Sequence, residues 1–148
     1  MINIKLKCDK SINKKLKTYK IPKRKLENIL TLLVNDKCKT RKWWWYDIKI
    51  CGINDTSSGY VWGSDKMEIA LRSHDCKNQK ERKLYFIQSI VHEFRHWVQD
   101  QIEKVPSKAL NYTERDTENL TKKYLDNKYE KEARVWEDKV EGMLDFLK

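Results

Sequence analysis

Residues 84–98 read LYFIQSIVHEFRHWV, and this stretch predicts the central helix of the protein. Its apolar residues Leu84, Ile87, Val91, Phe94 and Val98 recur at the spacing of one helix face. We therefore expect that face to be buried in the core, with the polar residues of the same stretch along its border.

Within this helix lies the motif His92-Glu93-Phe94-Arg95-His96. Residues four apart share a helix face, so His92 and His96 can both reach one metal ion at about 2.0–2.1 Å. Glu93 points away from that pair, where a carboxylate can accept a proton from a water on the open side of the metal. The motif predicts a Zn²⁺ site with His92 and His96 as ligands and Glu93 as the catalytic base.

A catalytic zinc ion usually has three protein ligands, so one remains to be found. No histidine follows His96, which leaves carboxylates. Residues 129–144 predict a second amphipathic helix, from which Glu130 or Glu132 could approach the first across a cleft. Residues 127–130 also match a helix capping box, which offers Glu130 a purely structural role. The apolar stripe of this helix is Tyr129, Ala133, Trp136, Val140 and Leu144.

The motif at residues 92–96 and the segment Glu130-x-x-Ala133 together resemble the gluzincins, the thermolysin-type division of zinc peptidases. The chain is similar to the small peptidases of phages and mobile elements, including the ImmA/IrrE type, over roughly residues 60–144. This resemblance implies a zinc-dependent endopeptidase with Glu130 as third ligand. Glu132, on the opposite side of the helix, is the rival candidate. Gluzincins often place Asp or Asn after the alanine. Here that position is Arg134, so Glu137, one turn on, is the candidate partner of a ligand histidine.

A hairpin is predicted just before the motif helix, with strands at residues 60–62 and 67–71 around a Gly63-Ser64-Asp65-Lys66 turn. In zincins the strand that precedes the active-site helix pairs with an extended substrate. The resemblance therefore implies a substrate edge, although an internal hairpin strand would have the same pattern. The edge would be formed by Met67, Glu68, Ile69, Ala70 and Leu71.

An oxyanion that develops during hydrolysis needs a hydrogen-bond donor. The spacing of residues does not choose among the candidates, which are Tyr112, Tyr124, Tyr129 and His74.

The remaining elements indicate one small α+β, zincin-like domain over residues 1–148, with a basic part at 1–50 and a catalytic core at 60–148. Residues 2–6 and 43–51 predict strands, and Pro22 begins an N-terminal helix. We expect a small, mostly antiparallel sheet, the motif helix and a long C-terminal helix. The chain has no apolar run long enough for a membrane span, and its first residues do not resemble a secretory signal, so we expect a cytoplasmic protein, in the host cell if viral.

The net charge of +10 comes from the first third of the chain. Residues 1–50 contain 15 Lys and Arg against 4 Asp and Glu, whereas the remainder is close to neutral. A basic region of this size attracts nucleic acid or an acidic protein, although lysine enrichment from an AT-rich genome would give the same composition.

The run Trp43-Trp44-Trp45 lies in this basic region. Aromatic residues beside cations can stack single-stranded nucleic acid, but the predicted strand would place alternate tryptophans in the core. The alternative function is therefore a nucleic-acid-associated protein with a structural metal site, or a DNA-linked protease similar to the SprT-like proteases.

Overall fold

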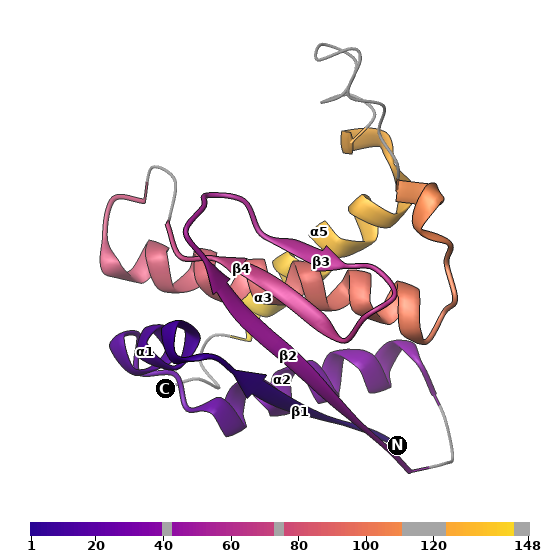
Figure 1. Ribbon diagram of the computed structural model, residues 1–148, viewed down its shortest axis with the longest axis horizontal. Coiled ribbons are helices and arrows are strands. Elements are labelled where there is room, and N and C mark those ends of the chain that lie inside the picture. The colour runs from indigo at the N-terminus through magenta and orange to yellow at the C-terminus, as the bar shows by residue number, and fades with distance from the viewer. Residues whose placement is uncertain (40–42, 73–75, 111–123, 144–148) are drawn as a thin grey trace.

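The computed structural model describes residues 1–39, 43–72, 76–110 and 124–143, and it has an α+β fold, as predicted (Figure 1). A four-stranded sheet has the order β1-β2-β4-β3. In Figure 1 the helices α2 and α3 lie behind the sheet, and α5 packs against α3. The elements are β1 (Ile2–Cys8), α1 (Lys10–Thr18), α2 (Lys23–Lys37), β2 (Trp44–Ile53), β3 (Gly59–Val61), β4 (Lys66–Ala70), α3 (Gln79–Gln101), the 3₁₀ turn η1 (Ser107–Leu110) and α5 (Lys128–Gly142).

The expectation of a mostly antiparallel sheet is wrong. Strand β2 pairs in parallel with both β1 and β4, and only β3 and β4 are antiparallel. The β3–β4 hairpin was predictable because its turn is local. The parallel pairs join distant segments, and the crossover from β1 to β2 passes through α1 and α2.

The predicted substrate edge at residues 67–71 is wrong as well. Strand β4 lies between β2 and β3, so both of its sides are paired. Met67 pairs with Tyr60 of β3 and with Ile50 of β2. The hairpin partner β3 occupies the side of β4 that the prediction left for substrate, and β3 is therefore the edge strand.

Helix α3 is the centre of the core, as its apolar pattern predicted. Ile87, Val91, Phe94 and Val98 are fully buried. Strand β4 packs against one side of α3 and α5 against the other, so every residue from 90 to 99 is buried, polar ones included. Although α3 has 23 residues, no helix in the described part of the chain is long and apolar enough to cross a membrane.

Helix α5 begins at the predicted cap. The Asn127 side chain accepts hydrogen bonds from the backbone N–H groups of Tyr129 (2.9 Å) and Glu130 (3.3 Å). Ala133 and Trp136 are buried against the core, while Leu144 lies outside the described residues. The cap places Glu130 in the first turn of α5, with its side chain turned toward α3.

Helix α1 was not anticipated from the sequence. Asp9 caps it by accepting from the Ile12 N–H (2.9 Å), and the other oxygen of Asp9 accepts from the Gly52 N–H of β2 (2.9 Å). A Cβ atom at Gly52 would overlap Ser11 Oγ and lie 2.7 Å from Leu71 Cδ2, so any other residue here would force these side chains to shift.

The outer edge of β1 is closed by polar side chains of α2. Four helix residues rise about 6.0 Å and two strand residues about 6.6 Å, so polar residues four apart on α2 can follow alternate backbone N–H groups of β1. The bonds run from Ile2 N to Asn35 Oδ1 (2.8 Å), from Ile4 N to Thr31 Oγ1 (3.2 Å) and from Leu6 N to Glu27 Oε2 (2.8 Å). Strand β1 is therefore protected against pairing with another chain.

Replacing Glu27 should destabilise the fold. The Glu27→Ala variant leaves the buried Leu6 N–H without an acceptor, which we expect to lower the free energy of unfolding by about 1–3 kcal/mol in urea titrations. Asn28→Ala is the matched control, because Asn28 is exposed on the same helix and its loss should change stability by less than about 0.5 kcal/mol. Equal stability of the two variants would contradict this role of Glu27.

The tryptophans at the start of β2 do not enter the core, contrary to the alternation predicted for this strand. Trp43, Trp44 and Trp45 are 65%, 55% and 61% exposed. Burial begins at Tyr46, whose ring packs edge-on against Trp97 of α3 at 4.9 Å. The start of β2 therefore extends beyond the part of the sheet that α3 covers.

Candidate metal centre

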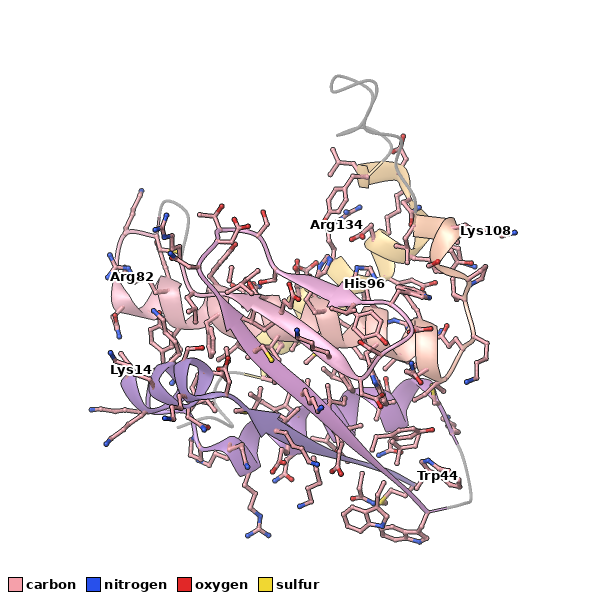
Figure 2. All side chains as sticks on the ribbon, viewed as in Figure 1. Lys14, Trp44, Arg82, His96, Lys108 and Arg134 are labelled. Atoms are coloured by element: carbon pink, nitrogen blue, oxygen red, sulfur yellow. The ribbon has the colours of Figure 1, made fainter. Side chains whose placement is uncertain are left out.

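Three side chains from two helices converge in the structure. His92 Nε2 lies 2.9 Å from Glu130 Oε2, His96 Nε2 lies 3.1 Å from Glu130 Oε1, and the two Nε2 atoms are 3.2 Å apart. Figure 2 marks His96 on α3 beside α5. All three residues are buried, and together they could hold a metal ion.

The spacing of these donor atoms, two imidazole nitrogens and the two oxygens of Glu130, suits a small metal ion. Ligand atoms at the corners of a tetrahedron, each about 2.0–2.1 Å from the metal, are about 3.3 Å apart. The observed separations of 2.9, 3.1 and 3.2 Å are close to that edge length. The donor set of two imidazole nitrogens and one carboxylate therefore fits in size as well as in chemistry.

The second nitrogen of each imidazole has a partner that orients the ring. His92 Nδ1 lies 2.9 Å from Glu137 Oε1, and His96 Nδ1 lies 2.8 Å from Gln99 Oε1. Gln99 Nε2 donates to the Tyr129 carbonyl (3.0 Å), which leaves its oxygen to accept from His96. In the neutral rings both Nε2 lone pairs then face Glu130, so three acceptors meet where a cation is needed.

The charges around His92 favour a cation at the same point. Burial alone would lower the pKa of His92, but its hydrogen bonds with Glu130 and Glu137 outweigh burial and raise that pKa to about 10. Burial likewise opposes ionisation of Glu130, yet hydrogen bonds with His92 and His96 hold its pKa below the ordinary value. The two carboxylates thus stabilise positive charge beside His92, carried by a proton or by a metal ion.

Glu93 lies next to the cluster but outside it. Its side chain is buried and lines the same cleft as His92 and His96. Burial raises the pKa of Glu93, and the neighbouring histidines oppose that rise. The helix rotation that sets Glu93 apart from His92 therefore places its carboxylate beside the cluster, in the same cleft.

The cluster opens into a cleft of about 510 Å³. The far wall is formed by the edge strand β3 and the residues just before it, and Trp62 and Tyr85 add aromatic surface. The Trp62 ring lies 6.4 Å from that of His96. An extended ligand in this cleft would contact both the edge strand and the cluster.

The predicted oxyanion donors differ in whether they line the cleft. Tyr124 lines the cleft, and burial raises its pKa to about 12. Tyr129 does not line it, and the Tyr129 carbonyl accepts from Gln99. Tyr112 and His74 lie outside the described residues.

Glu132, the alternative ligand, lies on a different side of α5. Its Oε2 atom is 2.7 Å from Arg95 Nη2 and 3.1 Å from Gln99 Nε2. Arg95 is only 1% exposed, pairs also with Glu103 and lies over the Trp136 ring at 5.0 Å. The Glu132 carboxylate therefore binds the buried Arg95 guanidinium and Gln99, the residue that orients His96.

Sequence reasoning missed Arg95 and Gln99. Both lie on the motif helix, and Gln99 is three residues after His96, a spacing at which side chains meet. That spacing was the available signal for Gln99. The pairing of Arg95 with Glu132 depends on the packing of α3 against α5, so no local pattern marks it.

Removing the carboxylate that orients His92 should weaken metal binding. Because Glu137 accepts from His92 Nδ1, we expect Glu137→Gln to lower metal affinity about 10–100-fold in competition titrations with a chromophoric chelator. Asp138→Asn is the matched control, since Asp138 is the next residue and exposed. Unchanged affinity in Glu137→Gln would show that this contact does not support the site.

Comparisons with protein-family models, with curated proteins and with solved structures found no match to this chain. Its function is therefore inferred from the chemistry of the residues themselves.

Proposed function

We propose that this protein is a zinc-dependent endopeptidase. The observation that carries the proposal is the convergence of His92, His96 and Glu130 in a cleft that Glu93 also lines. Two histidines and one glutamate are a ligand set of catalytic zinc sites, which keep a fourth position for water or substrate. The metal would be held by these three residues, with Glu137 and Gln99 orienting the two imidazoles.

Glu93 would act as general base and then as general acid. When bound, zinc would polarise the scissile carbonyl and lower the pKa of a water molecule toward about 7. Glu93 takes a proton from the attacking water as its oxygen bonds to the carbonyl carbon. The same proton then passes to the amide nitrogen as the C–N bond breaks, and the second proton of the water moves from the new carboxyl group to the amine, so the products are a carboxylate and an ammonium group.

Tyr124 is the described candidate for stabilising the carbonyl oxygen during attack. It lines the cleft with the cluster, and its phenol carries its proton at neutral pH, as any tyrosine does, with burial raising its pKa further. A protonated phenol can donate to an oxygen that gains negative charge. The Arg134 guanidinium lies over the Tyr124 ring at 5.4 Å and helps to hold the side chain in place.

The edge strand β3 supports a peptide as substrate. Ser58, Gly59 and Tyr60 line the cleft, and an extended peptide could add to this edge by main-chain hydrogen bonds. The other sheet edge, β1, is closed by α2. A peptide paired with β3 would pass beside the cluster, where Glu93 could act on an internal bond.

The direct test combines metal analysis with cleavage. Purified protein should contain about one zinc per chain, and it should cleave casein or a peptide library at internal bonds. A chelator should abolish cleavage and added zinc should restore it. If the zinc-loaded protein cleaves no member of a broad peptide library, the proposal fails.

A further inference from the structure

One face of the sheet is open to solvent. The helices α2 and α3 lie behind the sheet in Figure 1, and the side chains on the opposite face are exposed or half-buried. This open sheet face is formed by Asn3, Lys5 and Lys7 of β1, by Trp45, Asp47 and Lys49 of β2, and by Lys66 and Glu68 of β4.

Lysines occupy a continuous row across the open sheet face. Lys7 is paired in register with Lys49, and Lys49 with Lys66, on three neighbouring strands. Strands lie about 4.8 Å apart, and like charges directly opposite each other destabilise a sheet. The row therefore costs stability, which a bound anion would restore.

The carboxylates on this face neutralise only the ends of the row. Lys7 pairs with Asp47 (3.7 Å) and Lys66 with Glu68 (3.6 Å). For Lys49, between them, no carboxylate partner occurs among the residues that the structure describes. Because residues 1–50 carry 15 basic against 4 acidic residues, the wider surroundings of Lys49 are also positive.

Trp45 gives the same face an exposed aromatic ring. It precedes Lys49 by four residues on the same strand and side, so the two lie about 13 Å apart. Lys5, on the neighbouring strand, lies over the Trp45 ring at 5.8 Å. Trp44, the residue before Trp45, faces the other side of the sheet, where its ring lies 6.3 Å from that of Tyr46, and Figure 2 marks it well away from His96.

We propose that the open sheet face binds single-stranded nucleic acid, with a base stacked on Trp45 and phosphates on the lysine row around Lys49. Aromatic rings stack unpaired bases of any sequence, and cations beside them track the backbone. A duplex hides its bases from such a ring. The strand would run along β2, on the side of the sheet opposite the metal centre.

The arrangement favours this ligand over the other occupants of an exposed tryptophan surface. A second copy that added to the sheet edge nearest the tryptophans would need β1, which α2 closes, because the other edge, β3, lies two strands away from β2. A membrane surface would insert the tryptophans into lipid, yet Trp45 shares its face of the sheet with the charged residues Lys5 and Asp47. A face that combines an exposed aromatic ring with a row of lysines across neighbouring strands suits an extended polyanion.

The test is a fluorescence anisotropy titration of labelled oligo(dT) and oligo(U) of about 12 nucleotides with the full chain. We expect saturable binding at low salt, and a linear fall of log K with log salt at about 0.7 per phosphate contact. Trp45→Ala should lower affinity about tenfold or more, while Trp45→Phe, which keeps a ring, should retain most of it. Lys49→Gln should lower the salt slope by about 0.7.

One variant should raise the affinity for the oligonucleotides. Asp47→Asn removes a negative charge from the open sheet face and should strengthen binding. Leu32→Ala and Lys108→Gln are matched controls, because both residues are exposed but lie outside this face, and they should bind like the unchanged chain. Glu93→Gln should also bind normally, which separates this surface from the proposed peptidase. Circular dichroism melts verify that the variants are folded.

Three outcomes would overturn the proposal. The first is equal affinity of Trp45→Ala and the unchanged chain for both oligonucleotides. The second is no oligonucleotide binding at low salt combined with Trp45-dependent binding to vesicles of anionic phospholipid, which would assign the face to a membrane surface. The third is no oligonucleotide binding combined with a Trp45-dependent dimer in sedimentation, which would assign it to a second copy.

Discussion

Glu93→Gln should reduce the peptidase kcat by about 10²–10⁴-fold while zinc content stays at the level of the unchanged chain. Glutamine has nearly the same shape as glutamate but cannot take a proton from the attacking water. Glu93 is buried beside the ligands and is not one of the three converging residues, so the metal should remain in place. The measurement is kcat and KM for a cleaved peptide beside the metal-to-protein ratio of the same sample.

The folded state of this variant should be as stable as that of the unchanged chain or slightly more stable. Burial disfavours the ionised form of Glu93, so a neutral amide removes an unfavourable charge. Glu141→Gln is the matched control, because Glu141 is exposed and should change neither kcat nor stability. A zinc-loaded Glu93→Gln enzyme with kcat within a few-fold of the unchanged chain would rule out Glu93 as the base.

Glu130→Gln should lose most of its metal, with affinity lowered by more than about 100-fold. Loss of a residue that only orients a ligand costs about 10–100-fold, and Glu130 would be a ligand itself. The amide that replaces the carboxylate also removes the negative charge that favours a cation between His92 and His96. Peptidase activity at limiting zinc should fall together with the metal content.

Glu132→Gln is the control that makes this test sharp. Glu132 lies two residues further along α5 and contacts Arg95 and Gln99, not the His92–His96 pair. Its variant should therefore keep its zinc but unfold at lower urea concentration, because buried Arg95 loses a charged partner and keeps Glu103. The reverse pattern, with metal lost in Glu132→Gln and kept in Glu130→Gln, would show that the ligand assignment is wrong.

Local patterns predicted most of the elements. The apolar spacing of α3, the Asn127 cap of α5 and the β3–β4 turn each depend on residues close in sequence, and the structure has all three. The order of the sheet was not predictable in the same way, because β1, β2 and β4 pair across long connections. The exposure of the tryptophans was not predictable for the same reason. Strand alternation indicates which residues share a face of the sheet, but not how far the covering helix extends along that face.

The candidate site also has one part that the sequence predicts and one part that depends on tertiary packing. The sequence by itself determined that His92 and His96 share a helix face and that Glu93 does not, because that relation depends only on the rotation of about 100° per residue. Only the tertiary structure determines that Glu130, and not Glu132, lies beside the two histidines. These residues lie about 200° apart around α5, so the packing of α5 against α3 turns one toward the histidines and the other toward Arg95.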